Sequence, residues 1–227
     1  MTNTKAAHES RNFFLEGPAG QLEAILWKPV AQHQPSLAAL VCHPHPLFGG
    51  TMHNKVVYQA AKTLDVLGLP VLRFNFRGAG TSGGTHDRGR GEQGDVKAAV
   101  DFLAAEFPGV PLIVAGFSFG CWVGLRVGCA DERVQELIGL GTPVNSSDFS
   151  YLQDCEKAKL FVHGANDEHG RIEKVEALVE SFSGENQLVV VSGADHFFVG
   201  KLDQVDAAIR SWVTGRHPKL AARRYAE

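Results

Sequence analysis

Three residue types that together make a nucleophilic site occur in this sequence: a serine, an aspartate and a histidine, each after an apolar run. Ser118 lies in the pentapeptide GFSFG, residues 116–120, and Asp167 and His196 follow it in the chain. A serine hydroxyl is a weak nucleophile near neutral pH. It becomes reactive when an imidazole accepts its proton and a carboxylate orients that imidazole. We therefore expect Ser118 to be the nucleophile, His196 its base and Asp167 the partner of that base.

The context of the pentapeptide makes it informative. An apolar run, 110–115, comes before it and a helical pattern, 119–129, comes after it. This order predicts a sharp strand-to-helix turn with strained backbone angles at Ser118, and the two glycines of the pentapeptide avoid side-chain clashes there. The free N–H groups at the helix N-terminus would favour a developing oxyanion. Glycines 120, 124 and 128 share one face of the helix and predict its close approach to the sheet. The alternative interpretation is an ordinary glycine turn between a strand and a helix.

The acid and the base follow two further apolar runs. Asp167 comes after the run 159–162 and His196 after the run 187–191. Catalytic groups gather at the carboxyl ends of parallel strands, so we expect both side chains at the same edge of the sheet as Ser118. The order Ser, Asp, His along the chain agrees with such a site. The competing acids and bases nearby are His163, His169, Glu168 and Asp195.

The elements that position these residues alternate along the chain. Apolar, strand-like runs occupy 37–42, 69–76, 110–115, 134–140, 159–162 and 187–191, and helical patterns occupy 54–67, 95–107, 119–129, 172–182 and 202–213. This alternation predicts an α/β fold with a mostly parallel sheet and helices on both faces. Segments 13–15 and 22–27 flank a Gly-Pro-Ala-Gly turn and predict an antiparallel hairpin at one edge. We expect one domain over 1–227, with a core at about 12–213 and polar tails.

The segment from Gly141 to Ala158 connects two predicted strands. Its 18 residues must hold the helix that crosses the sheet, so we expect no cap domain and an open site. An open site leaves long acyl chains in water, which favours short-chain esters as substrates. The five phenylalanines near the site are either core residues or the lining of a groove, and they are Phe48, Phe117, Phe119, Phe197 and Phe198.

Composition excludes several classes of function. The 227 residues are 44% hydrophobic and 21% charged with a net charge of -3, so nothing predicts nucleic-acid or membrane binding. The basic residues near the C-terminus (Arg216, Lys219, Arg223, Arg224) suggest a solvated tail. The first twelve residues lack the apolar segment of a secretory signal, and the four cysteines form no CxxC pair. We expect a cytoplasmic protein, either monomer or homodimer, that acts on a small-molecule ester.

Several segments together are similar to one family. They are 42–52, which contains His-Pro-His-Pro, then 54–55, 72–82, 116–120, 163–167 and 193–198. In these segments the chain resembles the α/β-hydrolases, specifically small bacterial serine hydrolases and esterases. The resemblance implies catalytic roles for Ser118, Asp167 and His196, no cofactor, and an oxyanion hole made by the N–H groups of Phe119 and His45, with Leu47 as the alternative to His45. Dienelactone hydrolases are similar in size but use cysteine, so their activity does not follow.

Other motifs have simpler explanations. Residues 78–83 match GxGxxG, but a polar loop follows where a dinucleotide site needs a helix, so we expect no nucleotide cofactor. The histidines at 43, 45 and 53 have no carboxylate among them, and we expect no metal there. Cys121 is expected in the core, and Arg77 either braces the loop after its strand or forms a surface ion pair. A thioesterase, a lactonase or a non-catalytic binding protein on the same fold are the alternatives to an esterase.

Overall fold

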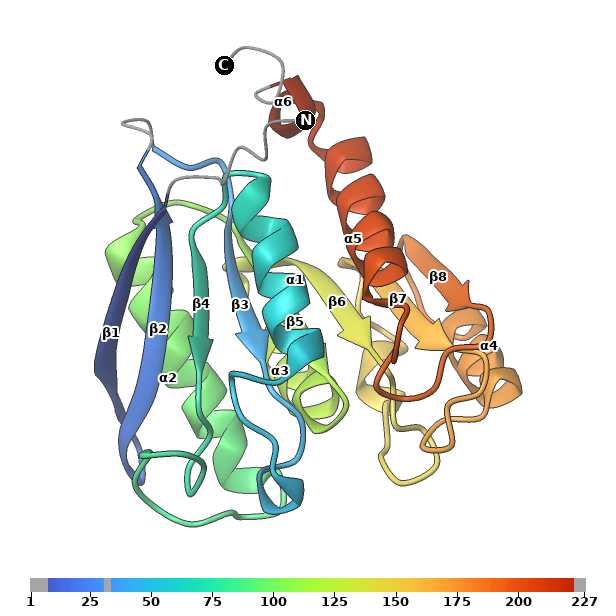
Figure 1. Ribbon diagram of the computed structural model, residues 1–227, viewed down its shortest axis with the longest axis horizontal. Helices are drawn as coiled ribbons and strands as arrows, with labels where there is room; N and C mark the ends of the chain where they lie inside the picture. Colours follow the sequence, from blue (N-terminus) through green and yellow to red (C-terminus); the bar gives the residue numbers. More distant parts are fainter. Residues whose placement is uncertain (1–7, 31–33, 223–227) are drawn as a thin grey trace.

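The computed structural model describes residues 8–30 and 34–222. In this part of the chain an eight-stranded sheet has the order β1-β2-β4-β3-β5-β6-β7-β8 (Figure 1). The strands are β1 (His8–Gly17), β2 (Gly20–Pro29), β3 (Ala38–Cys42), β4 (Val71–Phe74), β5 (Leu112–Phe117), β6 (Val134–Leu140), β7 (Ala158–Gly164) and β8 (Asn186–Val191). From β4 to β8 neighbouring strands are parallel, while β2 is antiparallel to both β1 and β4. The predicted mostly parallel sheet with an antiparallel hairpin is confirmed.

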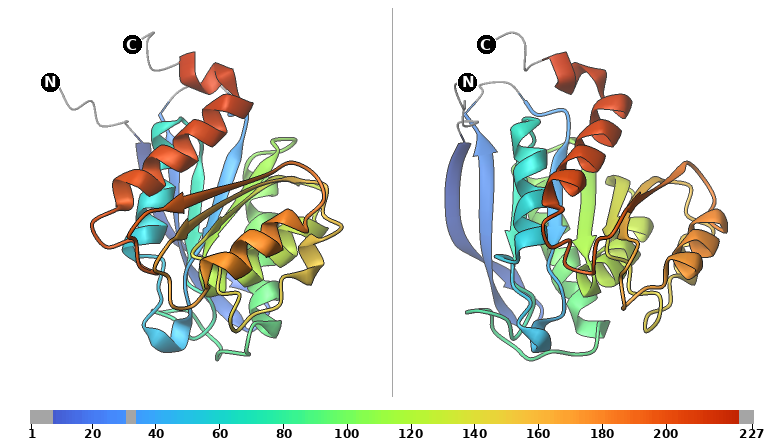
Figure 2. Two further views of the ribbon diagram at one scale, coloured as in Figure 1. Left: turned by 90° about the vertical axis from the view of Figure 1, so that its right-hand side faces the viewer. Right: turned by 45° about the vertical axis from the view of Figure 1, so that its right-hand side comes forward.

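Helices cover both faces of the sheet (Figure 2). One face carries α1 (Lys55–Val66) and α5 (Leu202–Arg216), and the other carries α2 (Arg90–Glu106), α3 (Phe119–Ala130) and α4 (Ile172–Glu180). The short helix α6 (Pro218–Ala222) follows α5, and two single 3₁₀ turns are η1 (Pro46–Phe48) and η2 (Ser150–Leu152). Every residue of β3 and β5 is buried, which explains why these strands read as unbroken apolar runs.

The helix that follows the pentapeptide packs closely on the sheet. A Cβ atom added at Gly124 would lie 3.1 Å from the Cys42 sulfur on β3, and one at Gly128 would lie 2.7 Å from a Leu137 methyl carbon on β6. The expected close approach of this helix is therefore confirmed. Glycine costs about 1 kcal/mol of helix propensity relative to alanine, and here it removes a side chain that the sheet leaves no room for. Cys121, on the same helix, is fully buried as expected.

The predicted limits of the core, about 12–213, were too narrow. The hairpin pairs over ten residues, from His8 opposite Pro29 to Gly17 opposite Gly20. Most of β1 is exposed, so this edge strand lacks the apolar pattern that identifies buried strands. At the other end α5 continues to Arg216, and Leu220 on α6 is buried. The polar residues 1–7 and two of the basic tail residues, Arg223 and Arg224, lie outside the described ranges.

The connection between β6 and β7 also differs from expectation. The predicted crossing helix is absent from residues 141–157, where the single 3₁₀ turn η2 is the only helical segment. Buried Phe149 and Leu152 pack into the core on the α3 side instead, and the Tyr151 hydroxyl donates to the Trp122 carbonyl at 2.8 Å. An irregular segment thus covers this part of the sheet, and no cap domain is inserted in it. None of the helices in the described ranges is long and apolar enough to cross a membrane.

Candidate active site

Ser118 occupies a strained turn between β5 and α3. Its backbone has φ 54° and ψ -118°, in the left-handed half of φ space, and it is the N-cap of α3. Such a conformation costs a non-glycine residue on the order of 1–3 kcal/mol. A Cβ atom at Gly116 would collide with the Gly120 backbone, and one at Gly120 would lie 2.5 Å from the Cys42 and His43 carbonyl oxygens. The clash at Gly116 is the one expected within the turn, whereas the clash at Gly120 would be with the end of the neighbouring strand β3.

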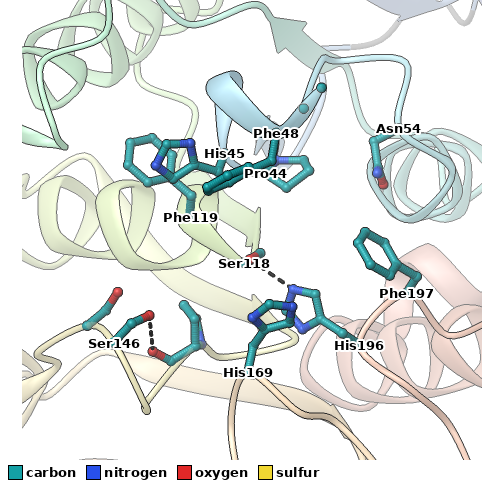
Figure 3. Close-up of a pocket in the computed structure, with 14 residues that line it drawn as sticks. Pro44, His45, Phe48, Asn54, Ser118, Phe119, Ser146, His169, His196 and Phe197 are labelled. Carbon is teal, nitrogen blue, oxygen red and sulfur yellow. Dashed lines mark hydrogen bonds between the residues drawn. The ribbon is translucent and has the colours of Figure 1, made fainter.

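A chain of hydrogen bonds links the three residues that the sequence selects. The His196 Nε2 lies 2.9 Å from the Ser118 Oγ, and its Nδ1 lies 2.7 Å from the Asp167 Oδ2 (Figure 3). A carboxylate only accepts, so Nδ1 carries the proton and Nε2 is left to accept from the serine hydroxyl. Ser118 follows β5, Asp167 follows β7 and His196 follows β8. The carboxyl ends of three parallel strands therefore bring these side chains together.

The Asp167 carboxylate is held ionised in a buried position. Its side chain is fully buried, and its Oδ1 accepts the His169 backbone N–H at 2.8 Å. Burial alone would raise the pKa of this carboxyl, but the hydrogen bond and charge of His196, with smaller contributions from His163 and the His169 N–H, hold the pKa below its usual value. Asp167 can therefore stabilise a positive charge on His196 when that ring takes a proton.

The competing histidines have other partners. His163 is buried, its Nδ1 accepts the Thr142 N–H at 3.1 Å, and its Nε2 donates to the Gly170 carbonyl at 2.7 Å. Burial lowers the pKa of His163, which agrees with a neutral ring that ties two loops together. The His169 ring lies against that of His196, with centroids 4.3 Å apart. Neither ring is hydrogen-bonded to Ser118.

The competing carboxylates face away from this chain of hydrogen bonds. Glu168 is 83% exposed and lies 3.8 Å from the His169 Nε2. Asp195 is exposed, and its Oδ1 accepts the Val199 N–H at 3.0 Å. The structure thus brings together one carboxylate, one imidazole and one hydroxyl from the candidates.

A cavity of about 220 Å³ lies beside the Ser118 hydroxyl. Figure 3 shows Ser118 and His196 at its centre, with aromatic and polar side chains around them. The lining residues are Pro44, His45, Phe48, Gly49, Gly50, Asn54, Ser118, Phe119, Pro143, Ser146, Ser147, His169, His196 and Phe197. Sequence reasoning gave no role to Ser146 and Ser147. Their signal was their place in a polar loop after β6, at the same edge of the sheet as the other strand ends.

The loop after β3 is shaped by its two histidines. His43 is fully buried, its Nδ1 donates to the Pro44 carbonyl at 2.6 Å, and its Nε2 accepts the Phe76 N–H at 2.9 Å. Burial lowers the pKa of His43 to about 3, so the ring is neutral. The His45 Nδ1 accepts the Leu47 N–H at 3.3 Å, which engages the alternative oxyanion donor. Within the described ranges, the N–H groups of His45 and Phe119 donate to no acceptor.

The other motifs have structural roles. The 78–83 loop closes on itself through the Gly78 N–H and Gly83 carbonyl, and the next helix, α2, begins only at Arg90. Arg77 forms a buried, bidentate ion pair with Asp95 on α2, so it braces this loop rather than lying on the surface. The described residues contain no group of three or more side chains that could hold a metal ion.

Comparisons with known proteins agree with this fold. The sequence model of the alpha/beta hydrolase domain matches residues 39–208. An uncharacterized protein of Rickettsia prowazekii (strain Madrid E) is 36% identical over 209 residues, which cover 88% of this chain and 87% of that protein. The structure of an α/β serine hydrolase homologue from Coxiella burnetii has a TM-score of 0.83 and 40% identity, covering 92% of this chain and 97% of that one.

A second structure is that of a Xanthomonas campestris α/β serine hydrolase described as having no lid. It has a TM-score of 0.84 and 37% identity, and the match covers 92% of this chain and 94% of that one. The fold and these relatives define the class of protein as a hydrolase. The chain belongs to the α/β-hydrolase family.

Proposed function

We propose that this chain hydrolyses short-chain carboxylic esters through an acyl-enzyme formed on Ser118. The observation that carries the proposal is the unbroken hydrogen-bonded chain from buried Asp167 through His196 to Ser118, which ends beside a cavity. The alternative of a non-catalytic binding protein would not need this chain of contacts or the strained backbone at Ser118.

In the proposed first step the Ser118 Oγ attacks the ester carbonyl while its proton passes to the His196 Nε2. Asp167 holds the ring through Nδ1 and stabilises the imidazolium. The charge on the carbonyl oxygen would be met by the N–H groups of Phe119 and His45, which have no acceptor in the described ranges. His196 then returns the proton to the alcohol as the ester C–O bond breaks. Water repeats the sequence on the acyl-enzyme and releases the acid.

Small substrates suit this site better than large ones. The cavity volume of about 220 Å³ is below the roughly 300–1,000 Å³ of drug-sized ligand sites. The same chemistry would serve a thioester or a lactone, which stay as alternatives within this reaction class. A panel of oxygen esters, thioesters and lactones with matched acyl groups separates them by kcat/KM.

Replacement of Ser118 tests the proposal most directly. A fluorophosphonate should label the protein once per chain, and Ser118→Ala should abolish the labelling. Ester turnover should fall by at least ~10³-fold, because only binding and the oxyanion donors are left. His196→Ala should be about as damaging, since the two groups act as a unit.

His169→Ala is the matched control, because its ring lines the same cavity without bonding to Ser118. It should keep most of the kcat. Near-wild-type hydrolysis by a folded Ser118→Ala protein would contradict the proposal. A silent His196→Ala beside an inactive His169→Ala would move the base to the other histidine.

A further inference from the structure

A second cavity, of about 470 Å³, lies between the start of α2 and the middle of α3. Its lining is Asp87, Arg88, Gly89, Arg90, Gln93, Trp122 and Arg126. Three arginines thus line one space that no step of the proposed hydrolysis uses. Its volume falls within the range of about 300–1,000 Å³ that small-molecule sites occupy.

The three arginines are not neutralised within the described part of the chain. None of Arg88, Arg90 and Arg126 forms an ion pair there, although most of the other arginines do. The Arg126 Nε is buried and has no hydrogen-bond partner. The guanidinium of Arg126 lies 4.2 Å from the Tyr151 ring centroid, and one terminal nitrogen donates to the Asp148 carbonyl at 3.4 Å.

The acidic groups near this cavity are committed to other partners. Asp87, which also lines it, accepts the Gly91 N–H at 3.0 Å. Glu92 is buried and accepts the N–H groups of Asp87 and Gly89. The Asp148 carboxylate accepts from Ser150, although it lies near enough to Arg126 for that charge to help lower its pKa. Among the residues that line the cavity, three arginines stand against one carboxylate, that of Asp87.

We propose that this cavity binds a phosphoryl group. Guanidinium groups present several N–H donors in a fixed plane and pair bidentately with phosphate oxygens, and three of them match a dianion. The backbone of Arg88 has φ 54°, a conformation that glycine adopts without steric cost but that is strained for arginine. The phosphoryl group is either free phosphate or part of an ester substrate.

The position of the cavity relative to Ser118 would allow the phosphoryl group to be part of an ester substrate. Trp122 contacts Phe119 of the first cavity with ring centroids 6.0 Å apart, and its indole N–H donates to the Asp148 carbonyl, next to Ser147 of that cavity. At 1.5 Å per residue, Arg126 is about 12 Å along α3 from Ser118. A phosphorylated ester of a few carbons can span this length. This second source rests on the proposed function, whereas phosphate binding itself does not.

The test is calorimetric titration of the full chain with inorganic phosphate, at mildly alkaline pH and constant ionic strength set with chloride. One saturable site per chain is expected, also in Ser118→Ala, which separates binding from hydrolysis. Arg126→Gln and Arg90→Gln should each weaken binding about ten-fold or more, the effect of losing a charge-assisted hydrogen bond. Lys62→Gln is the matched control: this exposed charge is on α1, across the sheet, and its loss should change affinity less than two-fold.

Arg88→Gly distinguishes a binding role from a structural one. It should weaken phosphate binding while the Tm stays equal or rises, because glycine relieves the strain at this position. Absence of saturable phosphate binding to the wild-type chain would overturn the proposal. Equal weakening by Lys62→Gln would do the same, because it would indicate only a general field of positive charge.

A comparison of kcat/KM for two esters, acetoxybutyl phosphate and hydroxybutyl acetate, distinguishes the two sources of the phosphoryl group. A substrate source predicts a kcat/KM at least ten-fold higher for the phosphorylated ester, and loss of that advantage in Arg126→Gln. A free-phosphate source predicts similar values for both esters together with saturable phosphate binding. Either result supports the site. If neither ester is hydrolysed but phosphate binds, the proposed short-chain ester hydrolysis fails and the phosphate site stands.

Discussion

Asp95 and Asp167 are both buried carboxylates that bind a nitrogen group, and of these two only Asp167 leads to the cavity beside Ser118. Asp95 on α2 is fully buried and takes three side-chain hydrogen bonds from Arg77 as well as its backbone N–H. Asp167 has an equally buried side chain and accepts from His196 and from the His169 N–H. The Arg77 donors end on Asp95, whereas His196 continues to Ser118.

The difference lies in the group that the carboxylate holds. Arginine stays protonated in proteins, so the Arg77–Asp95 pair is a fixed charge that braces the loop before α2. Histidine gains and loses a proton near neutral pH, and its second nitrogen is free to serve the serine. Burial and hydrogen bonding alone therefore do not identify a catalytic carboxylate. A path from the carboxylate to a reactive group beside a cavity does.

The largest expected effect comes from the carboxylate that serves the cavity. Asp167→Asn should lower kcat by roughly 10⁴-fold, because the amide favours the wrong imidazole tautomer while the geometry is kept. Steady-state ester hydrolysis measures kcat, and circular dichroism checks the fold. Asp195→Asn is the control, since the side chain of this exposed neighbour of His196 accepts the Val199 N–H and does not contact the ring nitrogens of His196. A greater loss of kcat in Asp195→Asn than in Asp167→Asn would mean that Asp195, and not Asp167, is the acid.

The opposite result is expected for the bracing carboxylate. Asp95→Asn leaves a buried guanidinium without its charge partner and should lower the free energy of unfolding by about 3–5 kcal/mol. The kcat of the folded fraction should stay within a few-fold of wild type. Urea titration measures the first quantity and active-site titration with a fluorophosphonate normalises the second. Asp101→Asn, which breaks half-exposed ion pairs with Lys97 and Arg133, should cost about 1 kcal/mol or less.

A stable Asp95→Asn protein with a large loss of kcat would reverse this comparison. It would mean that the loop braced by Arg77 helps position the groups around Ser118. The loop does reach the cavity side of the molecule, because the His86 ring lies 5.5 Å from that of Phe119. A large loss of stability with little change in kcat therefore indicates a bracing role for Asp95, and a large loss of kcat with little loss of stability indicates a role in catalysis.

The sequence was sufficient for the parts of this fold that repeat a strong pattern. Buried parallel strands such as β5 are apolar throughout, and the turn at Ser118 needs glycines that leave a recognisable pentapeptide. The edge strand β1 was predicted too short because its side chains are mostly exposed and carry no period. The helix predicted between β6 and β7 was wrong, since the prediction assumed that this crossover between parallel strands needs a helix, whereas an irregular segment with buried Phe149 and Leu152 covers the sheet instead.

The site was predictable to the extent that strand ends converge. The positions of Asp167 and His196 after β7 and β8 follow from the topology, and they were enough to favour His196 as the base. The hydrogen bonds that give the competing His163 other partners join loops and could not be predicted from sequence. The arginine cavity gave no sequence signal, because Arg88 and Arg90 are far from Arg126 in the chain. Contacts between distant segments such as these depend on how α2 packs against α3.

The smallest expected effect concerns what the cavity beside Ser118 accepts. No cap domain lies over it in the described ranges, and its volume is about 220 Å³. Phe117 and Phe198 belong to the core, while Phe48, Phe119 and Phe197 line the cavity. Of these, Phe48 is 87% exposed and Phe197 is 51% exposed, so they form an open rim rather than a closed channel.

An open rim leaves most of a long acyl chain in water, and each methylene so exposed forgoes about 0.8 kcal/mol of binding. We therefore expect kcat/KM to be highest for acetyl to butyryl p-nitrophenyl esters and to fall about ten-fold or more by a dodecanoyl chain. The series is measured below micelle-forming concentrations. Phe48→Ala should change kcat/KM for the longer esters more than for the acetate, because the rim contacts only the part of the acyl chain that extends beyond the cavity. A maximum at eight carbons or longer would mean that Phe48 and Phe197 close over the acyl chain, and that the opening beside Ser118 becomes a channel when substrate binds.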